Sequence, residues 1–257
     1  MDPQALIKRW LRKIGVEVGR TNPQVTLELL LPRLMFEFDV TCLADVGAND
    51  GRTTAGLRKG GYSGEIVSFE PDPAAFSVLA SRAATDLLWR THQTAIGRER
   101  NEKSLILSAG PTLGSFLPPD ENAIRHWNFV SEPLNSITVP VQRLDSILPE
   151  LVDLSVLDRI FLKMDIQGWD LEAFAGATGL LEKIVIIQTN LSLKTIYDGQ
   201  PTYREQLDVF EAAGFEPAGF FPWPIMDHNW ALIDVRTVFV RQGLRSNSKG
   251  TDVKSLA

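Results

Sequence analysis

The chain has 257 residues, of which 44% are hydrophobic and 23% are charged, and its formal net charge is −6. This apolar content suits one large α/β domain, whereas the acidic balance argues against a nucleic-acid partner, because phosphate binding needs a basic surface. Cys42 is the single cysteine, which excludes intramolecular disulfides and a cysteine-rich metal site. No signal-peptide core or run of about 18 apolar residues is present, so we expect a cytoplasmic protein without a transmembrane segment.

Residues 1–39 are predicted to form an N-terminal helical segment. Residues 4–14 place Trp10, Leu11 and Ile14 on one helical face and basic residues mostly elsewhere. Basic amphipathic helices contact membrane surfaces or partners, but they also pack on their own domain or on a second subunit. We favour packing, so a homo-oligomer through these helices is one expectation. A second helix is predicted over residues 25–38, where Pro32 would kink or divide it.

The stretch from residue 41 to 54 predicts a strand, a tight turn and the start of a helix. An apolar run reaches Asp45, and Gly47 and Gly51 follow four residues apart. Such a turn brings free N–H groups of a helix start to a ligand crevice. The loop lacks the G-x-G-x-x-G pattern of dinucleotide binding, and Asp45 would repel a pyrophosphate but attract the ammonium group of an amino-acid-like ligand. An ordinary strand-to-helix turn is the alternative.

The following residues repeat this rhythm of strand and helix. Residues 65–70 read as a strand ending at Glu70, and Asp72 with Pro73 suits the start of the next helix. The alternation predicts right-handed crossovers and a parallel sheet. Glu70 stands where nucleotide-binding α/β folds hold ribose hydroxyls, although a solvated strand-end glutamate is the alternative. A third strand is predicted over residues 87–96.

Between residues 99 and 140 the α/β rhythm stops. Residues 104–108 and 113–117 each read as a strand, and a Pro-rich loop with His126 and Trp127 follows. We interpret residues 99–140 as a β-rich insertion over the crevice, a common place for substrate specificity.

A second chemical stretch lies in residues 159–168, a buried strand with Asp165 near its carboxyl end. Ligand crevices of open parallel sheets lie at these ends, so Asp165 should face the same cleft as Asp45 and Glu70. It could serve as base, metal ligand or partner of a cation. Lys163 is two residues earlier on the same strand face and could pair with Asp165.

The C-terminal part continues with a strand over residues 183–192 that carries Asn190 near its carboxyl end. Thr202 begins a capping box for a helix. Residues 215–223 and 230–240 read as an antiparallel hairpin added to the sheet. We expect residues 242–257 to be a disordered tail.

Taken together, these motifs resemble the FkbM-type family of S-adenosylmethionine-dependent methyltransferases. The resemblance covers roughly residues 40–241 and rests on DVGANDG (45–51), FEPDP (69–73), LKMDIQGWDLEAFAGA (162–177), IQTNLS (187–192), YDGQP (197–201) and DVRTVFVR (234–241). It implies a Rossmann-like class I methyltransferase fold, with a seven-stranded, mostly parallel sheet and an antiparallel last strand. It also implies methyl transfer, usually to an oxygen of a sugar, polyketide or related natural product, with a sugar, polyketide or glycolipid precursor as the small-molecule acceptor.

The resemblance also places the cofactor. It puts Asp45, Gly47, Asn49 and Gly51 around the methionine part of S-adenosylmethionine, Glu70 on the ribose, and Asp72, Ala95 and Ile96 near the adenine. Ala48, Thr53, Pro71 and Asp165 complete the predicted cofactor site. On this interpretation, Asp45→Ala should weaken cofactor binding and leave the fold intact.

The predicted catalytic residues are Asp165, Lys163, Asn190 and His228, with Asp165 the favoured base and His228 the second choice. Family members often carry a glutamate in the place of Asn190, and a neutral amide can neither supply charge nor take a proton. A magnesium ion between Asp165 and Asn190 would suit hard oxygen ligands, but nothing in the sequence requires one.

Three tryptophans are candidates for stacking on the acceptor: Trp127, Trp223 and Trp230. The alternative is that they close the core or a subunit interface. Two further functions stay open, a non-catalytic cofactor-binding or scaffold protein, for which Asn190 is the hint, and a nicotinamide-dependent oxidoreductase, against which the missing glycine pattern argues.

Overall fold

The computed structural model describes residues 26–108, 114–127, 130–222 and 231–244. The strands of its larger sheet are β1 (Cys42–Val46), β2 (Glu65–Phe69), β3 (Trp89–His92), β7 (Ile160–Met164), β8 (Ile184–Ser192), β9 (Phe215–Pro222) and β10 (Asp234–Arg241). The helices are α2 (Leu27–Glu37), α3 (Arg52–Lys59), α4 (Pro73–Ala83), α5 (Glu121–His126), α6 (Leu144–Leu151), α7 (Asp170–Ala175), the 3₁₀ helix η1 (Thr178–Lys183) and α8 (Tyr203–Ala212). The expectations for residues 4–14 and for most of the C-terminal tail lie outside the described residues.

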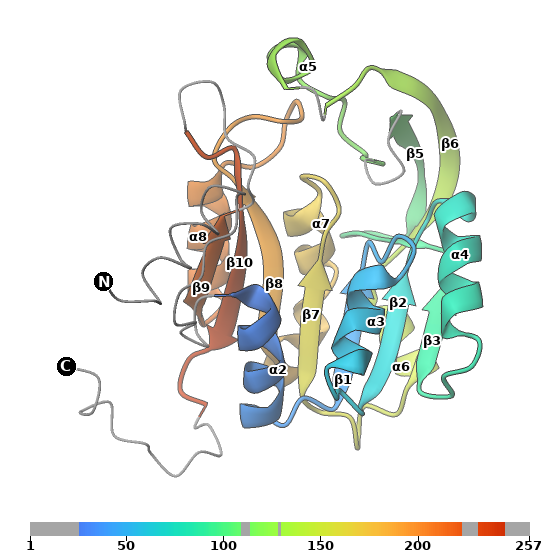
Figure 1. Cartoon of the computed structure of the whole chain (residues 1–257), viewed down its shortest axis with the longest axis vertical. Helices are drawn as coiled ribbons and strands as arrows, with labels where there is room; N and C mark the ends of the chain where they lie inside the picture. The colour runs from blue at the N-terminus through green and yellow to red at the C-terminus, as the bar shows by residue number, and fades with distance from the viewer. Residues whose placement is uncertain (1–25, 109–113, 128–129, 223–230, 245–257) are drawn as a thin grey trace, which may run out of the picture.

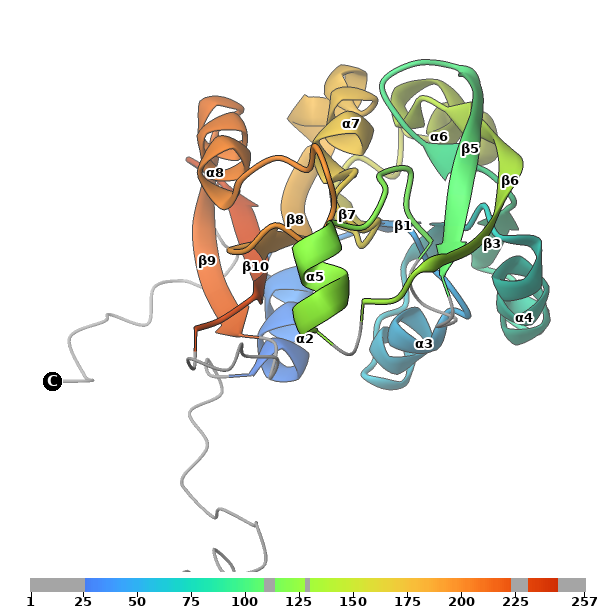
Figure 2. The same ribbon diagram turned by 90° about the horizontal axis from the view of Figure 1, so that it is seen from above.

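The larger sheet has the strand order β3-β2-β1-β7-β8-β10-β9. The pairs from β3 to β8 are parallel, and β10 is antiparallel to both β8 and β9. The seven-stranded, mostly parallel sheet with an antiparallel last strand is therefore confirmed, as is the hairpin of β9 and β10. Figure 2 shows α2, α3 and α4 on one face of this sheet and α6, α7 and α8 on the other.

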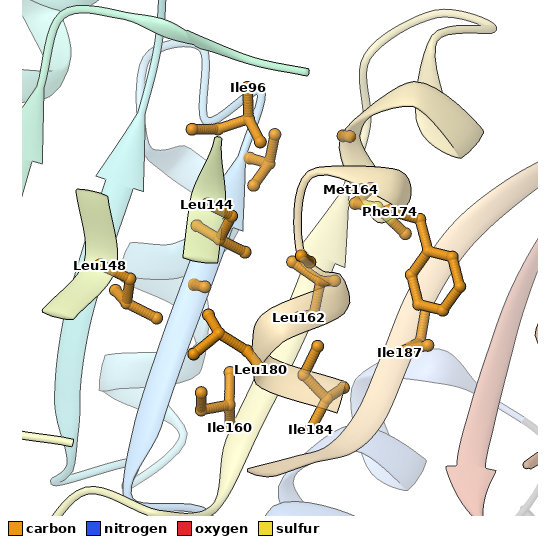
Figure 3. Packing of buried hydrophobic residues seen from close by; sticks show 14 of the residues in the cluster. Ile96, Leu144, Leu148, Ile160, Leu162, Met164, Phe174, Leu180, Ile184 and Ile187 are labelled. Carbon is orange, nitrogen blue, oxygen red and sulfur yellow. The ribbon is translucent and has the colours of Figure 1, made fainter. Parts of the chain in front are cut away.

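The two faces of the sheet build two separate apolar cores. Along β1, Cys42, Ala44 and Val46 point into one core, whereas Leu43 points into the other. All residues of β1 and β7 are buried, as expected for central strands covered by helices on both sides. Figure 3 shows the core under α6 and α7, where Leu144 and Phe174 pack with strand residues such as Leu162 and Ile187.

A second sheet of three strands confirms the β-rich insertion. It has the order β4-β6-β5, formed by β4 (Ala95–Ile96), β5 (Asn101–Ser108) and β6 (Pro133–Gln142). In Figure 1, β5, β6 and α5 lie above the carboxyl ends of the parallel strands. The insertion therefore stands over the edge at which ligands of such sheets bind.

Three local predictions were wrong. The strand expected over residues 87–96 is divided between the sheets, because the chain leaves β3 at His92 and Thr94 donates a hydrogen bond to the Pro140 carbonyl of β6 at 2.9 Å. The strand expected over residues 113–117 is a single bridge from Ser115 to Ile106 in its described part. The loop expected around His126 contains α5, which Asp120 caps by accepting two backbone N–H groups.

One helix differs in one respect from the expectation. Helix α2 continues through Pro32 without a second helix beginning there. Among the described helices, none is long and apolar enough to cross a membrane.

Candidate active site

A cavity of about 1330 Å³ opens at the carboxyl ends of the parallel strands. Its wall comes from the loop after β1, the end of β2, the residues after β7, the small sheet, Asn190, and Asp234 with Arg236. This volume exceeds the about 300–1,000 Å³ of most small-molecule sites, so two ligands have room side by side. A smaller cavity of about 320 Å³ lies at the opposite end of the sheet, under α2, where Asp39 and Tyr62 are the titratable lining residues.

The loop after β1 contains three residues with positive φ angles, a conformation that glycine adopts without steric cost. Gly47 has φ +75°, Asn49 has φ +51° and Gly51 has φ +74°. A Cβ on Gly47 would lie 2.3 Å from the Asp165 carbonyl oxygen, so Gly47 allows the loops after β1 and β7 to touch. A Cβ on Gly51 would lie 2.6 Å from Leu79 of α4. The first glycine therefore serves a contact between loops, and the second serves helix packing.

The N–H groups of this loop are mostly used within the protein. Gly47 and Ala48 donate to the Phe69 carbonyl at 3.0 and 3.1 Å, and Asn49 donates to Glu70 Oε2 at 2.7 Å. Arg52, the first residue of α3, donates its backbone N–H to Asp50. The expectation of free N–H groups at the helix start is thus wrong for Arg52. The bonds of Gly47, Ala48 and Asn49 fix the loop to the end of β2.

Asp45 lies beneath the cavity instead of on its wall. Its carboxylate is 1% exposed and accepts hydrogen bonds from Lys163 Nζ at 2.7 Å, from Ser68 Oγ at 3.4 Å and from the Thr54 hydroxyl. Lys163 therefore pairs with Asp45, and the expected pair with Asp165 was wrong. The reason is register, because Asp45 and Lys163 are direct neighbours across β1 and β7. Lys163 reaches the cavity wall and Asp45 does not.

The pKa of Lys163 is raised. Burial by itself would lower the pKa of this ammonium group, but the charges of Asp45 and Asp165 offset that effect. Lys163 therefore stays protonated, and it presents a fixed positive charge at the floor of the cavity.

Glu70 is held at the cavity wall by backbone groups. Its Oε2 accepts the Asn49 N–H at 2.7 Å and its Oε1 accepts the Asp72 N–H at 2.9 Å. Burial raises the pKa of Glu70 to about 7, against these two hydrogen bonds, which lower it. A carboxylate has about four acceptor positions, so lone pairs remain for a ligand.

Asp165 and Asn190 come together as the sequence suggested. Asn190 Nδ2 donates to Asp165 Oδ1 at 3.0 Å, and Gln167 Nε2 approaches the same oxygen at 3.4 Å. Gln167 in turn accepts a hydrogen bond from Tyr197 Oη at 3.0 Å. These amide donors fix the orientation of the Asp165 carboxyl group. Asp165, Gln167 and Asn190 all line the cavity.

Several site residues were missed from the sequence. Asp234 and Arg236, from the start of β10, lie on the cavity wall, and Asp170 lies buried beside Thr189, which donates to it at 2.9 Å. A usable signal existed for Asp234: an antiparallel strand begins at the edge where its parallel neighbours end, so its first residues reach the ligand crevice. Trp169 also lines the cavity, with its ring centroid 5.3 Å from that of Phe116 and 4.7 Å from Lys103 Nζ.

The structure places most of the predicted site residues either on the cavity wall or just behind it. Those on the cavity wall are Gly47, Ala48, Asn49, Thr53, Glu70, Pro71, Asp72, Ala95, Ile96, Lys163, Asp165 and Asn190, whereas Asp45 and Gly51 lie behind it. Trp127 packs into a small apolar cluster with Ile196 and Tyr197, and Ile196 lines the cavity whereas Trp127 does not. His228, Trp223 and Trp230 lie outside the described residues.

The described residues hold no group of three or more His, Cys, Asp and Glu side chains that could bind a metal ion. Asp165 and Asn190, the pair considered for magnesium, are hydrogen-bonded directly to each other.

We expect Asp170 to make the protein less stable as the pH rises. Burial raises the pKa of Asp170 from 3.8 to about 7, so the folded state holds a proton that the unfolded chain releases above about pH 4. The free energy of unfolding should therefore fall between pH 4 and pH 7. Asp170→Asn removes this dependence, and its stability relative to the wild type should rise by about 2–4 kcal/mol over that range.

Urea unfolding at pH 4.5 and pH 8 measures this change. The matched control is Asp208→Asn, at an exposed position on α8. The difference in unfolding free energy between this variant and the wild type should be the same at pH 4.5 and at pH 8. If the difference between Asp170→Asn and the wild type is the same at both pH values, Asp170 is not the titrating group.

Comparison with known proteins adds independent findings. The family model described as the methyltransferase FkbM domain matches residues 45–217. The 2-O-methyltransferase NoeI of Sinorhizobium fredii is 26% identical over 222 residues, which cover 84% of this chain and 88% of that protein.

Two solved structures are also similar to this chain. Methyltransferase FkbM from Methylobacillus flagellatus has 18% sequence identity and a TM-score of 0.46, over 77% of this chain. This chain spans 44% of the length of that one. The plantazolicin methyltransferase BamL, solved with a substrate analogue and SAH, has 9% identity and a TM-score of 0.48, over 93% of this chain and 90% of that one.

Proposed function

Because the chain belongs to the methyltransferase FkbM domain family, we propose that it transfers a methyl group from S-adenosylmethionine to a hydroxyl oxygen of a small acceptor, such as a sugar or another natural product. The main support for this proposal is that Glu70, Lys163 and Asp165 line the same cavity, which is large enough for two ligands. The name of the relative NoeI, a 2-O-methyltransferase, supports oxygen as the methylated atom. A cytoplasmic location stays a prediction from the sequence.

The residues present fit S-adenosylmethionine. Glu70 is fixed at the carboxyl end of β2 with lone pairs left for ribose hydroxyls, and Asp72, Ala95 and Ile96 follow along the wall toward the small sheet. The loop around Gly47 would hold the methionine part. Asp45 would act indirectly, by fixing Lys163 and the end of β1.

S-adenosylmethionine supplies an electrophilic methyl group on a positively charged sulfur. The protein's part is to hold the acceptor oxygen in line with that carbon, to exclude water and to accept the hydroxyl proton. Two carboxyl groups on the wall, those of Asp165 and Asp234, would face the acceptor side, and Trp169 with Phe116 would give it an aromatic surface.

Isothermal titration calorimetry with S-adenosylmethionine, S-adenosylhomocysteine and NAD tests the cofactor assignment. We expect both adenosyl compounds to bind and NAD to give no heat. Binding of NAD alone would favour the oxidoreductase. Transfer of a radiolabelled methyl group to methyl glycosides and polyketide alcohols separates an enzyme from a non-catalytic binding protein.

Glu70→Gln should weaken S-adenosylhomocysteine binding by about 10- to 100-fold, because hydrogen bonds to charged groups contribute about 1.5–3 kcal/mol. The amide has one acceptor oxygen, so it cannot accept both the Asn49 and Asp72 N–H groups and also bind a ribose. Calorimetry measures the change.

The matched control is Glu65→Gln, at the opposite end of the same strand, where Glu65 pairs with Arg90. It should bind S-adenosylhomocysteine like the wild type. Equal affinities of wild type and Glu70→Gln would remove Glu70 from the cofactor site.

A further inference from the structure

Lys163 carries a buried ammonium group that uses little of its hydrogen-bonding capacity. The residue is 3% exposed and lines the cavity, and an ammonium group has three donors. Among the described residues, its Nζ donates one hydrogen bond, to Asp45 Oδ1 at 2.7 Å. Because buried polar groups are generally hydrogen-bonded, the unused N–H groups of Lys163 at the cavity indicate an acceptor that a ligand supplies.

The start of α3 brings further donors close to this ammonium group. Thr54 donates its hydroxyl to Asp45 Oδ2, the second oxygen of the carboxylate that binds Lys163. The backbone N–H groups of Thr53 and Thr54 have no acceptor within the described part of the chain, and Thr53 lines the cavity. Free N–H groups at a helix N-terminus favour an anion. Lys163 and the start of α3 therefore favour the same kind of ligand group.

The neighbouring Asp165 restricts which anion fits. It lies two residues after Lys163, lines the same cavity, and its charge acts on the Lys163 ammonium group. A phosphate or a lone carboxylate would be attracted by Lys163 but repelled by Asp165. A carboxylate with an ammonium group beside it offsets that repulsion. The two residues together therefore favour an α-amino acid, which carries both charges on one carbon.

We propose that Lys163 binds the α-carboxylate in the methionine part of S-adenosylmethionine, together with the N–H groups at the start of α3. The inference rests on the proposed function and names the residue that binds this part of the cofactor. The loop proposed to hold the methionine part lies beside Lys163, because β1 and β7 are paired and Gly47 packs against the Asp165 backbone. Asp45 holds the ammonium group in place without touching the ligand.

The strand order supports the cofactor over the acceptor as the ligand of Lys163. Glu70, proposed for the ribose, follows β2, and β7 is two strands away in the sheet. Two strand spacings are about 10 Å, which suits two ends of one extended ligand. Arg236, a cation on the same cavity wall, projects from β10, which is four strands and about 19 Å from β2. Arg236 therefore lies nearer to the acceptor side than Lys163 does.

Isothermal titration calorimetry with two ligands tests the proposal without an acceptor. The ligands are S-adenosylhomocysteine and its decarboxylated analogue, which keeps the amino group. The wild type should bind S-adenosylhomocysteine about 10- to 100-fold more tightly than the analogue, the range expected for hydrogen bonds to a charged group. Lys163→Met should reduce this ratio at least about tenfold, while affinity for the analogue stays within about threefold of the wild type.

A second variant keeps the test independent of the buried charge. Lys163→Met leaves the Asp45 carboxylate without its partner, so Asp45→Ala with Lys163→Met is measured beside it, and its ratio should fall in the same way. The matched control is Lys183→Met. Lys183 donates to the Leu154 carbonyl at 3.0 Å and does not line the cavity, so its replacement should keep the wild-type ratio.

Three results would overturn the assignment. The first is a wild type that binds both ligands equally, and the second is an equal loss of both in the Lys163 variants, because a residue with only a structural role affects the two ligands alike. The third is a larger fall of the ratio in Arg236→Met than in Lys163→Met, which would assign the carboxylate to Arg236. Failure of the wild type to bind any adenosyl compound would instead contradict the proposed function, because the proposed ribose contact of Glu70 does not involve Lys163.

Discussion

Replacing Asp45 by alanine should lower the free energy of unfolding by about 3–5 kcal/mol, because it leaves a buried ammonium group without its partner. Lys163 is 3% exposed, and its Nζ lies 2.7 Å from Asp45 Oδ1. The same carboxylate anchors Thr54 of α3 and Ser68 of β2, and Ser68 accepts the Trp89 indole N–H at 2.9 Å. Since domains are stable by only about 5–15 kcal/mol, this change should be severe. The expectation from sequence of an intact fold in Asp45→Ala is therefore revised.

A double-mutant cycle isolates the ion pair. Lys163→Met alone leaves a buried carboxylate and should also destabilise the protein, whereas Asp45→Ala with Lys163→Met leaves no buried charge at either position. We expect the double variant to be more stable than Asp45→Ala, because apolar replacement of a whole buried pair is often nearly neutral. Urea unfolding at pH 7 measures all three. A double variant no more stable than Asp45→Ala would mean that the pair is not coupled.

The ion pair also shows what a sequence pattern leaves open. Residues two apart on a strand are about 6.5 Å apart, whereas neighbouring strands are about 4.8 Å apart, so Asp45 is the closer partner of Lys163 once β1 and β7 are aligned. The alternation of strands and helices predicted β1, β2 and β7 and that their carboxyl ends share a crevice. It carried no information on the register between strands that are distant in the sequence.

The same limit explains the other differences in the site. Glu70 and Asp165 were predictable because each follows a parallel strand at the edge where ligands bind. Asp234 enters that edge from the antiparallel strand β10, and its pKa is raised first by burial and then by the charge of Asp165, which lies on a separate segment. The small sheet was predicted as an insertion, but its pairing of residues 95–96 with residues 141–142 of β6 joins segments far apart in the chain.

Asp45 and Gly47 thus support the cavity in complementary ways. The Asp45 carboxylate ties the end of β1 to β7 by charge, and Gly47 lets the next part of the chain lie against the Asp165 backbone. The Asp165 N–H donates to the Val46 carbonyl at 3.0 Å, so the two loops are joined at the residue that precedes Gly47. A side chain at position 47 would move the loop after β1, which would hold the methionine part of the cofactor, away from Asp165.

Gly47→Ala should therefore destabilise the protein by about 2–5 kcal/mol. A left-handed conformation costs a residue with a Cβ roughly 1–2 kcal/mol, and forcing an extra methyl group into a packed site costs about 1–3 kcal/mol. Both apply here, because φ is +75° and the new Cβ would lie 2.3 Å from a backbone oxygen and 2.6 Å from the Ile166 side chain. S-adenosylhomocysteine affinity should fall as well, since relief of the contact moves the loops after β1 and β7 apart.

Gly199→Ala is the matched control, because Gly199 has φ +76° and a Cβ there would meet nothing within 4 Å. This variant places a residue with a Cβ in a left-handed conformation but creates no steric clash. Urea unfolding should therefore show a free energy of unfolding lower by only about 1–2 kcal/mol. The difference between the two variants measures the contact between the loops. If both lose the same stability and Gly47→Ala binds S-adenosylhomocysteine like the wild type, the close approach of Gly47 to Asp165 has no energetic role, and glycine is needed there for its backbone conformation alone.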